Sequence, residues 1–231
     1  TFFLVNYEGS RTREARTRLA IVPSTENLAG GFEEAITDPF TGEPFANGII
    51  PETRVARLAD VARSTEFWPL ANADLPRGRN FRGVDRRTTD TNQRTYRLDQ
   101  VLGRHGSIFG RLTKSDLVNV TPTLPTPKGD KFVNQEATSW QVSHTALISP
   151  TLVNQFRFGY LNYTADQFGA TMPDADIARL GLSGVFTNLS GRQKTPPRVS
   201  LSGISTGGGS LNAVSLSNQP MIDFSNGTTL I

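Results

Sequence analysis

The chain has 231 residues, with 24 basic and 21 acidic side chains and a formal net charge of +3. It has no cysteine and only two histidines, which excludes disulfides, thiolate metal sites and cysteine catalysis and leaves little for a histidine metal cage. The 21 glycines and 14 prolines favour a turn-rich β protein over a helical one. No apolar run reaches about 18 residues, so no transmembrane helix is predicted.

Six segments show the period-two alternation of β-strands. In chain order they are residues 1–9, 95–102, 107–114, 137–147, 152–163 and 221–231. Tight turns at 103–106 and 149–151 join two of the strand pairs, and long loops are expected at about 10–93, 116–136 and 164–219. Two helices are expected inside the loops, at Glu52–Glu66 and Asp174–Leu180.

The contrast between short turns and long loops is typical of an outer-membrane barrel, which has short turns at one rim and long loops at the other. Strands of about nine to eleven residues also suit a tilted crossing of a bilayer. The predicted fold class is therefore all-β: a partial transmembrane antiparallel β-barrel, an open curved sheet of about six strands with long extracellular loops containing short helices. A soluble β-sandwich, acting as an adhesion or carbohydrate-binding module, shows the same alternation and is the alternative.

The alternation divides the strand residues between two faces. One face is apolar and aromatic and is predicted to contact lipid; its members are Tyr96, Leu98, Ile108, Leu112, Trp140, Val142, Phe156, Phe158 and Tyr160. The other is predicted to face the lumen, with Glu8, Arg97, Asp99, Arg111 and Arg157 as its charged members. These charges either line a solute path or form a cross-strand ladder that only supports the barrel.

The remaining motifs favour structural roles. His105 and His144 have no accompanying catalytic motif, and Asp174–Asp176 lacks the further acidic positions of a calcium loop. Gly207–Gly209 lacks the residues of a phosphate loop and is expected to be a flexible loop tip. The arginine-rich stretch 77–94 could bind nucleic acid, lipid phosphates or acidic ligands, but a solvated loop is favoured. No catalytic residue, metal site or cofactor is predicted, and hence no enzyme.

Seven segments carry a family resemblance in one order. They are Phe2–Gly9 (Phe-Phe-x-x-Asn-Tyr-Glu-Gly), Asp38–Phe45, Ile49–Arg54, Trp68–Asn72, Phe109–Arg111, Ser143–Tyr160 and Ile177–Gly184. Together they resemble the barrel of large TonB-dependent receptors of the Oar-like type, which carry a carboxypeptidase-regulatory-like domain. The departures are small: Trp68 replaces Tyr, Ala71 replaces Pro and Ile108 replaces Leu.

The resemblance implies energised uptake of a large solute, such as an oligosaccharide, a peptide or a chelate, through the outer membrane of a Gram-negative bacterium. The implied partners are outer-membrane lipid, the TonB complex acting through a plug domain, and an extracellular ligand, with no nucleic acid and no cofactor. The apolar ends of the chain and the lack of plug motifs predict that residues 1–231 are one part of a barrel of about 22 strands, without the plug or the carboxypeptidase-regulatory-like domain.

Overall fold

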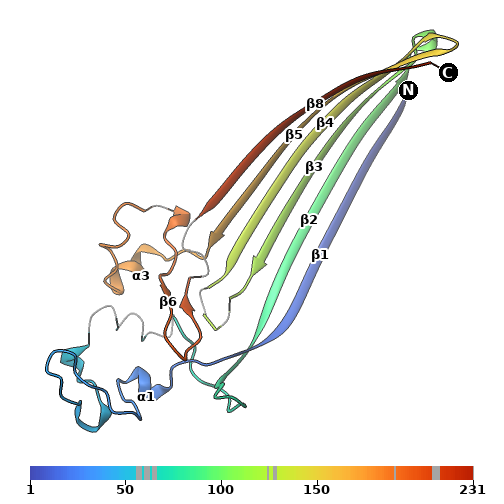
Figure 1. The fold of residues 1–231 in the computed structure, drawn as a ribbon. Coiled ribbons are helices and arrows are strands. Elements are labelled where there is room, and N and C mark those ends of the chain that lie inside the picture. The colour runs from blue at the N-terminus through green and yellow to red at the C-terminus, as the bar shows by residue number, and fades with distance from the viewer. Residues whose placement is uncertain are drawn as a thin grey trace.

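The computed structural model describes residues 1–55, 59, 63, 67–123, 125–126, 129–189, 191–209 and 214–230. Its main element is one antiparallel sheet in the order β1-β2-β3-β4-β5-β8. The strands are β1 Phe2–Ala20, β2 Phe81–Val101, β3 Ser107–Thr121, β4 Lys131–Ser149, β5 Leu152–Gly169 and β8 Ser215–Leu230. Within the described residues β1 and β8 form opposite edges and do not pair with each other, so the sheet is open and curved (Figure 1). The predicted fold class is confirmed.

The two ends of the sheet differ, as the sequence predicted. At the end that carries both chain termini, β2 joins β3 through a short turn with the 3-10 helix η3 (Gly103–His105), and β4 joins β5 through Pro150 and Thr151 (Figure 1). Gly106 closes the first turn at φ 92°, and a Cβ there would lie 1.8 Å from the carbonyl oxygen of Thr145. Only glycine fits such a turn. The connections at the opposite end are long.

The strands extend further than predicted, and the loop boundaries at 10–93, 116–136 and 164–219 were wrong. β1 and β2 pair without a break from Phe2 opposite Asp99 to Ala20 opposite Phe81. The connections between strands are therefore residues 21–80, 122–130 and 170–214. The added strand segments carry polar side chains on both faces, so they lack the alternation that marked the other segments. Cross-strand pairs and the backbone ladder hold them instead.

The long connections contain short helices and one small hairpin. The helices are α1 Thr25–Leu28, η1 Ala46–Gly48, η2 Glu52–Arg54, α3 Asp174–Arg179 and η4 Gly191–Gln193, and the hairpin pairs β6 (Arg198–Val199) with β7 (Gly207–Gly208). α3 confirms the helix predicted at Asp174–Leu180. Of the helix predicted at Glu52–Glu66, residues 56–58, 60–62 and 64–66 lie outside the described residues. No helix in the described part of the chain is long and apolar enough to cross a bilayer.

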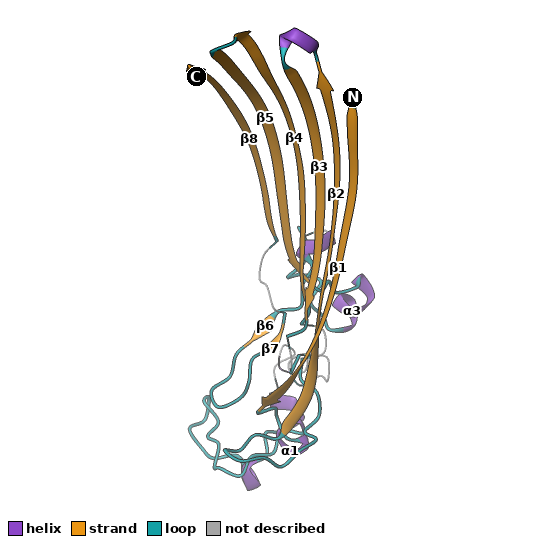
Figure 2. Ribbon diagram, turned by 90° about the vertical axis from the view of Figure 1, so that its right-hand side faces the viewer, coloured by secondary structure: helices purple, strands orange, loops and turns teal. Residues whose placement is uncertain are grey.

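Apart from Ala20 and Phe81 at the ends of β1 and β2, the buried core is formed by residues of the long connections. These connections gather at the end of the sheet opposite the chain termini (Figure 2). The core members are Ala20, Val22, Phe67, Trp68, Phe81, Met172, Ile177, Leu180, Leu182 and Phe186. They bring together the 21–80 and 170–214 connections, which we call the loop body. The indole of Trp68 donates a hydrogen bond to the carbonyl oxygen of Ser205 at 2.8 Å. The side chain of Asn80 bonds both the N–H and the carbonyl of Val22, each at 2.8 Å.

Gly207 and Gly208 belong to this packed region, so the prediction of a flexible loop tip was wrong. Both are buried in β7. A Cβ on Gly207 would lie 2.5 Å from Cε2 of Trp68, and one on Gly208 would lie 1.8 Å from the carbonyl oxygen of Pro197. The glycines are needed because the hairpin backbone passes directly against the Trp68 ring.

Candidate functional site on the two faces of the sheet

The nine residues predicted to contact lipid share one face of the sheet. Residues that pair across antiparallel strands point to the same side, and one row runs from Leu98 through Gly110, Val142 and Phe158 to Phe224. The neighbouring row contains Tyr96, Leu112, Trp140, Tyr160 and Ile222. Ile108 and Phe156 flank His144 in the row on the other side. We call this surface the aromatic face.

The aromatic face is open to its surroundings. None of its nine predicted residues is buried, and Leu98 retains 54% of its accessible surface. The ring of Trp140 lies 5.2 Å from that of Phe158 and 5.8 Å from that of Tyr160. The face also includes Ile222 and Phe224 of β8, which the sequence prediction did not name. An exposed apolar band of this extent is abnormal for a soluble monomer.

The five residues predicted to face the lumen share the opposite surface, which we call the polar face. Arg97 pairs across the sheet with Arg111, and Arg157 lies opposite Ser143 in the adjacent row. Glu8 lies opposite Gln93, two rows further along on the same surface. The separation of the faces is not absolute, because Leu4 and Met221 also lie on the polar face, on the two edge strands.

The five predicted charges of the polar face do not form a ladder of ion pairs between strands, which was one of the two alternatives. The guanidinium of Arg97 bonds both carboxylate oxygens of Asp99, two residues along the same strand, at 2.7 Å each. It also lies 4.1 Å from the ring centre of Phe109. Arg111 donates to Gln141 at 3.4 Å, and Arg157 donates to Gln155 at 2.9 Å. The polar face is thus a surface of separate hydrogen-bonding groups, with several charges held by neutral partners.

A cluster that the sequence analysis missed lies beyond the aromatic face, on the same surface and toward the long loops. We call it the outer arginine cluster; its members are Tyr7, Arg11, Arg13, Asp90, Asn92 and Asp116. It was missed because residues 10–93 were taken as a loop, whereas the arginines between 82 and 94 lie on β2. The sequence carries no local signal of this cluster, because Arg11 and Asp90 come together only when β1 and β2 pair.

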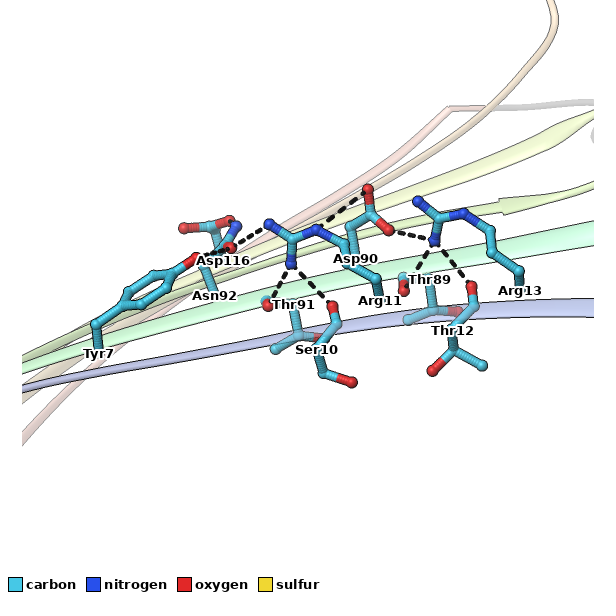
Figure 3. Close-up of polar contacts among 10 residues, drawn as sticks. All are labelled: Tyr7, Ser10, Arg11, Thr12, Arg13, Thr89, Asp90, Thr91, Asn92 and Asp116. Carbon is cyan, nitrogen blue, oxygen red and sulfur yellow. Dashed lines mark hydrogen bonds and ion pairs between the residues drawn. The ribbon is translucent and has the colours of Figure 1, made fainter.

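The arginines of the cluster are held by both side-chain and backbone oxygens (Figure 3). Arg11 donates to the carbonyl oxygens of Ser10 and Thr91, each at 2.9 Å, and to Asn92 Oδ1 at 2.6 Å. Tyr7 donates to the same Asn92 oxygen at 2.9 Å. These bonds fix the position of the Arg11 guanidinium above the sheet.

Arg13 and Asp90 form the second half of the cluster. Arg13 Nη1 donates to Asp90 Oδ1 and to the carbonyl oxygen of Thr12, the latter at 2.9 Å. Arg11 Nε also lies 3.9 Å from Asp90 Oδ2, so this carboxylate lies between two guanidiniums.

The other candidates take structural roles. Asp174 pairs with Lys194 at 2.6 Å and Asp176 with Arg179 at 3.2 Å, as expected for carboxylates at a helix start. Nε2 of His144 lies 3.3 Å from the carbonyl oxygen of His105. The described residues contain no group of three or more side chains placed to hold a metal ion.

The sheet has the features of a section of the wall of a membrane β-barrel: long paired strands, an exposed aromatic face, a polar opposite face and two open edges. A family model for the outer membrane beta barrel domain matches residues 1–231, and the chain belongs to this family. The membership indicates an outer-membrane protein of a Gram-negative cell. Comparison with curated proteins and with solved structures gave no match.

Proposed function

We propose that the chain forms part of the wall of a TonB-dependent outer-membrane receptor that takes up a large solute, such as an oligosaccharide, a peptide or a chelate. One observation carries the proposal. The strand pairing keeps the predicted lipid-facing residues on one face of the sheet and the predicted lumen-facing residues on the other, and the outer edges of the six-stranded sheet stay open. Such a wall closes with further strands, and the diameter of a barrel grows with strand number. A wide lumen suits a large solute.

The length of the strands supports an orientation in the membrane. The six strands have 15 to 21 residues, whereas a tilted crossing needs about nine to eleven. The aromatic face lies toward the short turns, so the remaining residues of each strand stand out of the bilayer on the side of the long loops. In barrels of this kind the long loops are extracellular. The aromatic face then contacts lipid and the polar face lines the lumen.

The position of the loop body supports uptake over a purely structural role. Ala20 and Phe81 pair with each other at the ends of β1 and β2, and the register assigns both to the polar face. Both are buried in the loop-body core. The loop body is therefore attached on the lumen side, at the end where an extracellular ligand would arrive. Coupling to the TonB complex through a plug is part of the proposal and rests on the family resemblance.

The alternative of a soluble β-sandwich has less support. A sandwich buries one face of each sheet under the other, but the only second sheet in the described residues is the two-residue pair of β6 and β7. We also propose that the protein is not an enzyme, since the polar side chains of the residues that the structure describes form ion pairs and sheet contacts.

Uptake can be tested in cells that express the protein. A fluorescent oligosaccharide and a corrinoid, both too large for general porins, serve as probes, with and without an uncoupler of the proton gradient. Uptake that the uncoupler abolishes supports the proposal, and uptake that it does not affect indicates a passive channel.

Arg111→Gln and Arg86→Gln form a matched pair for the same assay. Arg111 lies on the polar face, and Arg86 lies on the opposite face, in the part of β2 beyond the bilayer. We expect Arg111→Gln to change uptake while the amount of protein in the outer membrane stays constant, and Arg86→Gln to change neither. Equal effects on uptake would contradict the assignment of the lumen.

A further inference from the structure

The outer arginine cluster lies where the aromatic face ends. Tyr96 and Leu112 belong to the last row of the aromatic face, and the next row on the same surface contains Tyr7, Arg94 and Lys114. Arg11 and Arg13 follow three and four rows beyond Tyr96 along β1. An aromatic residue followed by cationic ones is the usual order at the boundary between hydrocarbon and lipid headgroups.

The outer arginine cluster has two arginines and two aspartates, and the positive excess comes from its neighbours Arg94 and Lys114. Arg11, Arg13 and Arg94 face two carboxylates, Asp90 and Asp116. Lys114 lies beside Arg94 and adds a further cation. The nearest other carboxylate on this surface, Glu136, lies opposite Asp116 on β4, so the positive excess is confined to β1, β2 and β3.

The guanidinium groups are ordered and still accessible. Backbone carbonyls of Ser10, Thr12 and Thr91 hold Arg11 and Arg13 in place. Their side chains nevertheless keep 47% and 53% of their accessible surface. A guanidinium that is already fixed loses little conformational entropy when it binds an anion, and its planar array of donors matches a phosphate group.

We propose that the outer arginine cluster binds the phosphate group of a lipid headgroup in the leaflet next to the long loops. The proposal rests on the proposed function, because the aromatic face must lie in the bilayer for the cluster to reach headgroup level. Arg11 and Arg13 supply the phosphate donors, and Tyr7 packs at the boundary beneath them. Asp90 keeps Arg11 and Arg13 in position, and Asp116 pairs with Arg94. Lys114 adds a further positive charge beside Arg94.

The test compares lipid binding in two bilayers. The complete barrel that contains this chain is refolded into phosphatidylcholine vesicles with or without phosphatidic acid and extracted in mild detergent. The bound phosphatidic acid is then counted by native mass spectrometry. The variant is the double substitution Arg11→Gln with Arg13→Gln. The matched control is Arg16→Gln, which lies on the same strand but on the polar face, where Arg16 pairs with Glu14.

We expect phosphatidic acid to bind the wild-type protein and the Arg16→Gln control equally. Each neutralised arginine should weaken binding about fivefold, so the double variant should lose roughly 25-fold. Raising the salt from about 0.1 M to about 1 M, which shortens the screening length from about 10 Å to about 3 Å, should weaken binding by the wild type more than by the double variant.

Three results would overturn the inference. The double variant could bind phosphatidic acid as well as the wild type, or Arg16→Gln could lose as much as the double variant. Inorganic phosphate could displace the lipid completely, which would identify a site for free anions. In each of these cases, insertion of the complete barrel into both kinds of vesicle leaves the proposed function standing. If it inserts into neither, the proposed function fails as well.

Discussion

Replacing Phe158 with arginine tests which face of the sheet contacts lipid. Phe158 lies between Val142 and Phe224, and its ring packs 5.2 Å from that of Trp140. Its row lies between the two other rows of the aromatic face, close to the middle of the apolar band. Arginine at the midplane of a barrel costs about 2–4 kcal/mol, and the lost ring contact adds about 0.5–1.5 kcal/mol. We expect a loss of about 3–5 kcal/mol in the free energy of unfolding.

Arg157→Ala is the matched control, one residue away on the polar face. Arg157 is exposed and its hydrogen bond goes to Gln155, so its loss should cost at most about 1 kcal/mol. The complete barrel carrying each variant is refolded into lipid vesicles and unfolded with urea, and the free energies are compared with that of the wild type. If Arg157→Ala prevents refolding while Phe158→Arg is tolerated, the two faces are inverted and the reasoning from register is refuted.

Two further predictions concern the long-loop end. Gly207→Ala places a Cβ 2.5 Å from the Trp68 ring and should destabilise the loop body by about 1–3 kcal/mol, which limited proteolysis would detect as faster cleavage. The control is Gly184→Ala, where a Cβ meets nothing within 4 Å, and it should leave the cleavage rate unchanged. Equal cleavage rates for the two variants would contradict the packing of Gly207 against Trp68. Burial, and secondly the charge of Asp85, raise the pKa of the Asp130 carboxyl. The folded state then keeps this proton to higher pH than the unfolded chain, so the free energy of unfolding should fall as pH rises from about 4 through the raised pKa. Asp130→Asn should remove this fall, and parallel pH profiles would contradict it.

The faces of the sheet could be predicted because side-chain direction in a strand depends only on residue parity. Phe156, Phe158 and Tyr160 show their common face in five residues of sequence, and pairing with the neighbouring strand cannot change it. The same reasoning failed for the second half of β1. Residues such as Arg11 and Glu14 are polar on both sides of the strand, so no alternation distinguishes them from a loop.

The loop body could not be predicted because its contacts join residues far apart in the chain. Trp68 packs against Gly207, and its indole reaches the carbonyl of Ser205. No local sequence pattern predicts either contact, because Trp68 next to Pro69 and the glycines at 207–209 are both compatible with an open loop. The outer arginine cluster was missed for a related reason, since Arg13 and Asp90 meet only when β1 and β2 pair across the 21–80 connection.

The two open edges constrain the order of events when this sheet enters a bilayer. Along the outer side of β1, every second residue directs its N–H and carbonyl away from β2. Over a crossing of about ten residues this leaves roughly ten backbone groups, each costing several kcal/mol in hydrocarbon. The total of tens of kcal/mol exceeds the roughly 5–15 kcal/mol by which a folded domain is stable. Lipid therefore cannot reach β1 or β8 first, and sealing of the edges must accompany insertion as a single step.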